Sequence, residues 1–253
     1  MSLDLGLEGR TAIISGSTRG VGFAVAEALA RAGAKVAINY RRNEQKAQSA
    51  LDRLNYLGCS AIAVRADVSS EEGALRLVSE ASAALGNIDI LVNNAHGNIV
   101  RSAFESSTWD EHQSHFEGIL KSAYFLTRAV ISGMKERGHG SIVNIGNNMV
   151  MQPIRGYSAY TSSMAALLGF TRNLAAEAGP WGVTVNMVSP GFVMTEEAPN
   201  TTEAVRAAIT EATPLKRLAM PEDIAGAVLF FCSDLSQFVT GANLSVDGGK
   251  VMG

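Results

Sequence analysis

The alternation of short apolar runs with longer helical patterns is the feature that most constrains the fold of this 253-residue chain. The apolar runs lack the apolar/polar alternation of half-exposed strands, so they are typical of strands covered on both faces. Alternating strands and helices build a parallel sheet with right-handed crossovers and helices on both faces. The expected strands are Thr11–Ser15, Lys35–Asn39, Ala61–Arg65, Ile88–Asn93, Ser141–Ile145, Val183–Val188 and Asn243–Val246. The expected helices are Val21–Ala32, Glu44–Leu57, Glu71–Leu85, Thr108–Glu136, Ala159–Ala178 and Pro221–Cys232.

Composition narrows the class of protein. A hydrophobic content of 47% is enough for a large core, and we predict a single domain over residues 1–253. A net charge of −3 gives no indication of a nucleic-acid surface or a basic membrane patch. No apolar run approaches the roughly 20 residues that span a bilayer, and the N-terminus does not resemble a signal peptide.

The two cysteines, Cys59 and Cys232, have neither CxxC nor metal-ligand spacing. We interpret them as free thiols in a reducing compartment. The sequence therefore predicts a soluble cytoplasmic protein without a metal site.

A glycine-rich turn follows the first expected strand and opens the first expected helix. Glycines at such a turn let the backbone approach a pyrophosphate, which then rests on the helix N-terminus. The spacing is G-x-x-x-G-x-G, and its place between a strand and a helix makes it a stronger signal than the glycines alone. The predicted cofactor-binding residues of the turn are Gly16, Ser17, Thr18, Arg19, Gly20, Val21 and Gly22.

The end of the second expected strand indicates which nucleotide is bound. A free ribose 2′-hydroxyl favours a carboxylate at this place, but the chain has Asn39, Tyr40, Arg41 and Arg42 there. Guanidinium groups, including that of Arg19 in the glycine turn, pair well with a 2′-phosphate. We predict NADP(H) as the cofactor. The alternative is that Arg41 and Arg42 are ordinary solvated charges.

With these motifs, the chain resembles the short-chain dehydrogenase/reductase family over nearly its whole length, and within it the 3-oxoacyl-carrier-protein reductases. The resemblance implies a Rossmann-type, doubly wound, seven-stranded parallel sheet. It also implies a homodimer or homotetramer. Asp67 and Val68 match the family's adenine contact, Asn94 and Ala95 its N-N-A-G motif, and Pro190, Gly191, Val193 and Thr195 its loop that holds the nicotinamide carboxamide. The closing T-G-x-x-x-x-x-D-G-G motif runs from Thr240 to Gly249.

The catalytic positions depart from the family pattern. The family uses an Asn-Ser-Tyr-Lys set, in which the tyrosine protonates the substrate oxygen and the lysine lowers the tyrosine pKa and binds the ribose. Tyr160 matches the tyrosine, which the resemblance also places against the cofactor. The lysine position is Met164, the serine position is Asn147, and the asparagine position is Ile119.

These departures weaken the expected proton chemistry. A tyrosine phenol has a reference pKa of about 10 and needs a neighbour that favours the phenolate, which Met164 cannot be. Ile119 interrupts the water relay, whereas the amide of Asn147 can still donate a hydrogen bond to an oxygen.

Two histidines are candidates to compensate for the missing lysine. His96 replaces the last glycine of N-N-A-G beside the expected nicotinamide pocket, and histidine titrates near neutral pH. His115 precedes Ile119 by one helical turn and is expected on the same face. For both, the alternative is an ordinary packed or hydrogen-bonded histidine. Lys121 should point to another face.

Two further segments carry predictions. Residues 192–214, rich in Thr, Glu and Ala, form a candidate flap over the site. The helix after Tyr160 is small or apolar almost all round, although a helix buried on one side should show a polar face. We expect its outer side to meet another subunit.

Three functions remain open. The first is an NADP(H)-dependent oxidoreductase acting on a carbonyl or alcohol, such as a ketone or acyl thioester, with Tyr160, Asn147 and His96 as the candidate catalytic residues. The second is a cofactor-binding accessory or regulatory subunit without redox turnover. The third is a non-redox enzyme that uses His96 and Tyr160.

Overall fold

A computed structural model of the chain describes residues 4–196 and 201–252. Seven parallel strands form one sheet in the order β3-β2-β1-β4-β5-β6-β7, which confirms the predicted fold class. The order reverses between β1 and β4, the place where ligands bind in doubly wound sheets. The strands are β1 Thr11–Ile14, β2 Lys35–Tyr40, β3 Ala61–Arg65, β4 Ile88–Asn93, β5 Gly140–Ile145, β6 Val183–Pro190 and β7 Asn243–Val246.

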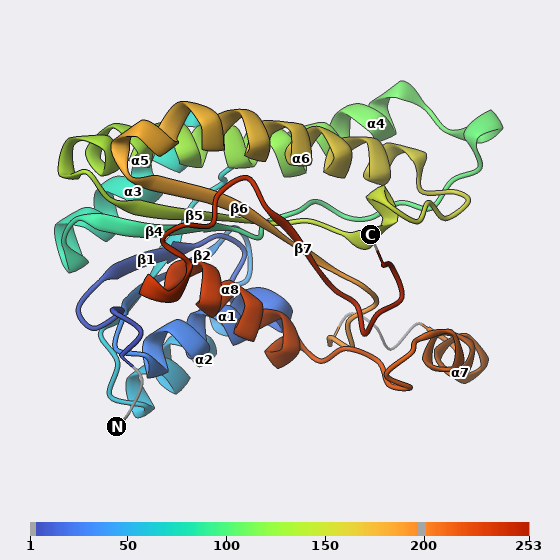
Figure 1. Ribbon diagram of the computed structural model, residues 1–253, viewed down its shortest axis with the longest axis horizontal. Helices are drawn as coiled ribbons and strands as arrows, with labels where there is room; N and C mark the ends of the chain where they lie inside the picture. The colour runs from blue at the N-terminus through green and yellow to red at the C-terminus, as the bar shows by residue number, and fades with distance from the viewer. Residues whose placement is uncertain (1–3, 197–200, 253) are drawn as a thin grey trace.

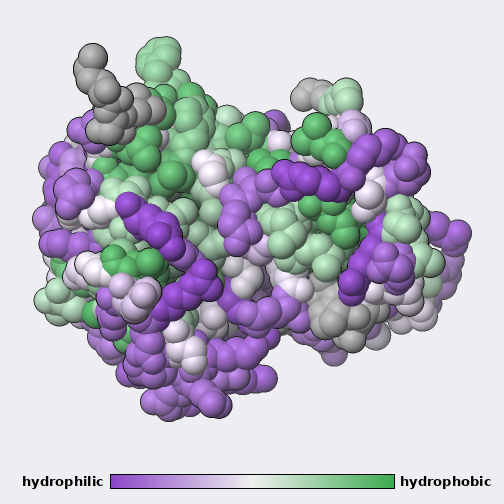
Figure 2. Space-filling view, turned by 90° about the horizontal axis from the view of Figure 1, so that it is seen from below, coloured by the Kyte–Doolittle hydropathy of each residue, from purple (hydrophilic) through white to green (hydrophobic). Residues whose placement is uncertain are grey.

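Helices cover both faces of the sheet (Figure 1). One face carries α3 Glu71–Leu85, α4 Trp109–Phe116, α5 Ser122–Arg137 and α6 Ser158–Ala178. The other carries α1 Gly20–Arg31, α2 Glu44–Tyr56 and α8 Pro221–Cys232. Seen from below, this second face is mostly hydrophilic, with apolar side chains gathered toward its upper left (Figure 2).

The core lies in two layers because successive residues of a strand point to opposite faces. In β1, Ile13 packs with the side chains under α3 and α5, whereas Ile14 packs with those under α1 and α8. Both are completely buried. Burial on both faces explains why the strands read as continuous apolar runs.

The helix expected over Thr108–Glu136 is present but contains an unexpected irregularity. It begins with a capping box between Thr108 and Glu111, and a π-helical turn at Glu117–Lys121 separates α4 from α5. Such a turn inserts a residue into the helix and is often found at functional sites. Ile119, the position of the family's asparagine, lies in this turn.

The predicted flap follows β6 and contains α7 Glu203–Ala212, none of whose residues is buried. Residues 197–200 of the flap lie outside the described residues. At its start, Glu196 forms an ion pair of 3.3 Å with Lys46 in the first turn of α2. In the described part of the chain, no helix has both the length and the apolar character needed to cross a membrane.

Candidate active site

The glycine turn after β1 is shaped by close backbone contacts. A Cβ on Gly22 would lie 2.5 Å from Asn94 Nδ2 and 2.6 Å from the carbonyl oxygen of Gly16. Asn94 Nδ2 donates hydrogen bonds to the carbonyl oxygens of Ser15 and Gly16, each at 3.0 Å. Any larger residue at 22 would therefore open the turn, as expected where a backbone must approach a phosphate.

The N-terminus of α1 fits an anionic ligand. Its N-cap, Arg19, makes no capping hydrogen bond with its side chain, and the first turn has no acidic residue. The helices α2, α3 and α4 are instead capped by the side chains of Asn43, Ser70 and Thr108. The first-turn N–H groups of α1 are thus left for an anion such as a pyrophosphate.

Asn39 lies beneath the glycine turn. Its Oδ1 accepts the Gly16 N–H at 3.3 Å, and its Nδ2 donates to the Ala66 carbonyl at 3.1 Å. The side chain is buried, and its polar atoms bond to backbone groups of the glycine turn and of the segment after β3. Tyr40, which follows it, is half-buried at the rim.

Arg41 and Asp67 lie together at the end of the cleft, with the guanidinium 3.5 Å from the carboxylate. Partial burial alone would raise the pKa of Asp67, but hydrogen bonds from Ser69 and the charge of Arg41 outweigh it and hold the pKa below its usual value. Arg41 is exposed. The next predicted contact, Val68, is buried.

The carboxamide loop extends from Pro190 toward the glycine turn. A Cβ on Gly20 would lie 3.4 Å from Thr195 Cγ2, so the end of the loop reaches the turn. Val193 pairs with Ala219 in an isolated bridge. The glycine turn and the end of this loop thus lie next to each other.

Asp247 packs against the start of this loop at Gly191. The sequence did not predict this role. A Cβ on Gly191 would lie 2.8 Å from Asp247 Cβ. The buried carboxylate accepts hydrogen bonds from the N–H groups of Gly249, Lys250 and Val251. It also accepts one from Asn148 Nδ2 at 3.0 Å. The family motif pointed to Asp247, but no signal in the sequence pointed to Asn148.

Tyr160 and Asn147 meet at the carboxyl end of β5. Tyr160 is only 5% exposed, and burial raises its pKa well above the usual value, while a hydrogen bond from Asn147 opposes this rise. Asn147 Oδ1 accepts the Met149 N–H at 2.8 Å, which orients the amide so that Nδ2 donates to the phenol oxygen. Tyr160 is therefore a neutral phenol whose own O–H proton stays available for donation.

The lysine and asparagine positions have become apolar together. Met164 and Ile119, each 3% exposed, belong to one buried cluster with Tyr160 and Met187. Met164 and Met187 are thus core residues, and Met151, at 55% exposure, lies at the surface. Replacing a buried polar network by packed apolar groups is often neutral or stabilising. Tyr160 therefore packs against apolar side chains at the positions where the family pattern has polar ones.

His115 contacts Tyr160, as its position one turn before Ile119 had indicated. The two rings pack edge to face with their centroids 5.8 Å apart. His115 is 2% exposed, and burial, with a smaller contribution from His112 and His96, lowers its pKa below the usual 6.5. Lys121 instead points away, exposed and 3.8 Å from Glu117.

His96 is exposed, and its Nδ1 lies 2.8 Å from the carbonyl oxygen of Gly97. The loop that carries it runs against the π-helical turn, since a Cβ on Gly118 would lie 2.8 Å from the Gly97 nitrogen. His96 thus lies near His115, at the rim of the site.

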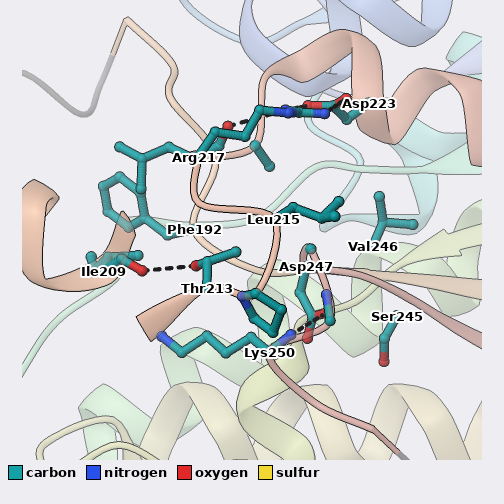
Figure 3. Close-up of a pocket in the computed structure, with 15 residues that line it drawn as sticks. Phe192, Ile209, Thr213, Leu215, Arg217, Asp223, Ser245, Val246, Asp247 and Lys250 are labelled. Atoms are coloured by element: carbon teal, nitrogen blue, oxygen red, sulfur yellow. Dashed lines mark hydrogen bonds and ion pairs between the residues drawn. The ribbon is translucent and has the colours of Figure 1, made fainter. Parts of the chain in front are cut away.

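A pocket of about 490 Å³ lies between the flap and the segment after β7 (Figure 3). Phe192 of the carboxamide loop lines it, together with Leu215 and Lys250. Neither Tyr160 nor Asn147 does. In the described part of the chain, no group of three or more His, Cys, Asp or Glu side chains could hold a metal ion.

Comparisons with known proteins agree with this architecture. The family model described as Enoyl-(Acyl carrier protein) reductase matches residues 16–250. The chain belongs to the short-chain dehydrogenase/reductase family. It is 35% identical to 3-oxoacyl-[acyl-carrier-protein] reductase from Escherichia coli (strain K12) over 249 residues, which is 98% of this chain and 100% of that protein.

Two further comparisons extend the range of relatives. The chain is 36% identical over 246 residues to L-rhamnose 1-dehydrogenase (NAD(P)(+)) from Sphingomonas sp. (strain SKA58), covering 96% of each. A solved short-chain dehydrogenase/reductase from Serratia marcescens BCRC 10948 superposes with a TM-score of 0.90 at 31% identity, over 96% of this chain and 98% of that one. The family is thus one of oxidoreductases.

The buried His115 should make the stability of the protein sensitive to mild acid. In the unfolded chain this histidine binds a proton below about pH 6.5, whereas the folded chain binds it only at lower pH. The folded state keeps the stability that neutral His115 contributes at pH values above about 6.5. It loses this stability as the pH falls from there through the lower pKa of His115 in the folded state. We expect the Tm to fall between about pH 6.5 and about pH 5, and His115→Phe to flatten this fall.

The control is His139→Phe, because His139 is half-exposed beside Asp89, away from Tyr160. Thermal melts across this pH range measure the effect. An equal slope in wild type and His115→Phe would contradict the prediction.

Proposed function

We propose that this chain is an NADP(H)-dependent reductase of a ketone or acyl thioester, with Tyr160 as the proton donor. The observation that carries the proposal is the orientation of Asn147, whose amide donates to the Tyr160 oxygen and leaves the phenol proton for a substrate. The names of the relatives, which are reductases and dehydrogenases, support the reaction class.

The cofactor proposal rests on the cleft. The glycine turn, the uncapped N-terminus of α1 and the carboxamide loop would hold the pyrophosphate and the nicotinamide. The absence of an acid at the end of β2, together with Arg41, favours a 2′-phosphate over a free 2′-hydroxyl. When bound, the reduced cofactor supplies a hydride to the carbonyl carbon.

The chain's own residues supply the proton. The Tyr160 O–H bond breaks as a new O–H bond forms on the substrate oxygen, and the phenolate left behind keeps the Asn147 hydrogen bond. No cation neighbours it in the cluster of Ile119, Met164 and Met187. Because a lost electrostatic donor costs about 10²–10³-fold in rate, we expect slower turnover than in relatives with a lysine.

Removing the phenol oxygen tests this role. Tyr160→Phe should lower NADPH oxidation with a β-ketoacyl thioester analogue by about 10²-fold or more. NADPH binding, measured by fluorescence, should stay within about 3-fold, because the cleft is intact. Tyr157→Phe is the matched control, since Tyr157 packs beside the same cluster and stacks under Arg101. Unchanged turnover in Tyr160→Phe would contradict the proposal.

The apolar side chains of Ile119 and Met164 beside Tyr160 also favour a second function, a cofactor-binding accessory subunit without turnover. The discriminating variant is the double substitution Ile119→Asn/Met164→Lys. Met164→Lys alone would bury an ammonium among apolar groups, which lowers the lysine pKa and destabilises the fold. The double variant supplies a polar partner.

We expect the double variant to oxidise NADPH about 10²-fold faster than wild type, at a lower Tm. Activity that appears only in the double variant would identify the wild type as the silent subunit. Activity already present in the wild type would exclude it. No gain in the double variant would contradict the role assigned to the apolar cluster.

We further propose that the protein is a homodimer or homotetramer joined through α6. The outward positions of its first half are small, with Ala165 and Gly169 exposed, whereas Arg172 and Glu177 in the second half are polar. Nothing lies within 4 Å of a Cβ built on Gly169. Gly169→Arg should therefore reduce the assembly mass measured by light scattering without unfolding the subunit. Ser49→Arg, on the exposed surface of α2, is the control. An unchanged mass would exclude this face.

A further inference from the structure

We propose that His115 on α4 returns to Tyr160 the proton that Tyr160 gives to the substrate. The proposal rests on the carbonyl reduction assigned above. It makes His115 a positioning and relay residue that acts through Tyr160.

The contact between the two rings is the first support. His115 lies edge to face with Tyr160 at 5.8 Å between centroids, and both rings are almost fully buried. His115 is therefore a titratable side chain in direct contact with the proposed acid. Tyr160 also packs in one buried cluster with the apolar side chains of Met164 and Ile119, neither of which can exchange a proton.

The second support is an unpaired nitrogen. The Val100 N–H points to His115 Nε2 at 3.4 Å, so Nε2 is the acceptor and the proton sits on Nδ1. Nδ1 is buried and has no hydrogen-bond partner within the described residues. Buried polar atoms are almost always paired with protein, water or ligand. The Nδ1–H of a ring packed against the proposed proton donor is thus not bonded directly to the Tyr160 oxygen, and one water would connect the two groups.

The third support is a route to the surface. His112, one turn earlier on α4, is half-buried, and His96 on the adjoining loop is exposed. Both lie close enough to affect the charge of His115, as does Glu111. Tyr160 faces the ring from α6. The Val100 contact places the Nε2 side of the ring against an exposed loop residue.

The proton balance follows from this arrangement. The Tyr160 phenolate takes a proton from the bridging water, which takes the Nδ1 proton of His115, so one O–H bond forms at Tyr160 and one N–H bond breaks at His115. Nε2 gives up its contact with the Val100 N–H and takes a proton from solvent on the loop side, which leaves the ring neutral with its proton on Nε2. Histidine can shuttle protons in this way because one ring nitrogen can release a proton while the other takes one up. No oxidant or further reactant is needed.

Paired substitutions at His115 test the relay. His115→Phe keeps an aromatic ring against Tyr160 but has no nitrogen, and His115→Ala leaves space for free imidazole. We expect kcat for NADPH oxidation with a β-ketoacyl thioester analogue to fall by about 10²-fold in both, with the Kd for NADPH unchanged. Added imidazole should restore His115→Ala but not His115→Phe. The control is His139→Phe.

The pH profile separates a relay from a structural role. Wild-type kcat should fall as the pH rises from about 6 to about 9, because the ring takes up protons less readily. In His115→Phe, kcat should be low and flat over this range. Equal kcat and equal profiles in wild type and His115→Phe would overturn the proposal.

Nuclear magnetic resonance provides a readout that does not need activity. In wild type, the His115 Nδ1–H should appear as a slowly exchanging resonance, and Tyr160→Phe should shift it or speed its exchange. An unchanged resonance in Tyr160→Phe would overturn the relay even if the enzyme is active. If wild type shows no turnover on any carbonyl, the proposed function fails, and this resonance alone decides whether the two rings are coupled.

Discussion

Hydrogen bonds at the carboxyl end of β1 hold the glycine turn against the ends of the neighbouring strands. Ser15 Oγ accepts the N–H groups of Asn94 and Ala95 at 3.0 and 2.9 Å, which joins β1 to the end of β4. Asn39 joins the same turn to β2 and β3. Because these buried groups are paired with each other, the glycine turn has a fixed shape before any ligand binds. Everything that is proposed for the nucleotide depends on this preorganisation.

The chemistry at Tyr160 rests on a different kind of packing. The positions that carry charge and water in the family pattern are filled by Ile119 and Met164, which pack in one apolar cluster. Such a change removes a buried polar network as a unit, so it costs little stability, but it leaves the phenol strongly protonated. Two polar side chains contact Tyr160: Asn147 bonds to its oxygen, and His115 packs against its ring. The site therefore favours giving a proton over taking one.

Much of this could be predicted from the sequence. Apolar runs gave the strands to within one or two residues, because strands buried on both faces need such runs. The resemblance to the family matched Met164, Asn147 and Ile119 to the family's lysine, serine and asparagine positions. The π-helical turn at Glu117–Lys121 could not be predicted, because it depends on how the loop at Gly97 packs against Gly118. The bond from Asn148 to Asp247 joins residues far apart in the chain, and no local pattern encodes it.

The contacts of the Asp247 carboxylate affect how the chain folds during its synthesis. It joins the last residues of the chain to Asn148 and lies against Gly191, the start of the loop over the cleft. Chains are synthesised from the N-terminus, and their earlier parts can fold first. The strands β1 to β5 and the glycine turn can thus assemble while later residues are still being synthesised. The packing of Gly191 against Asp247, however, cannot form until residues 247–251 have been synthesised.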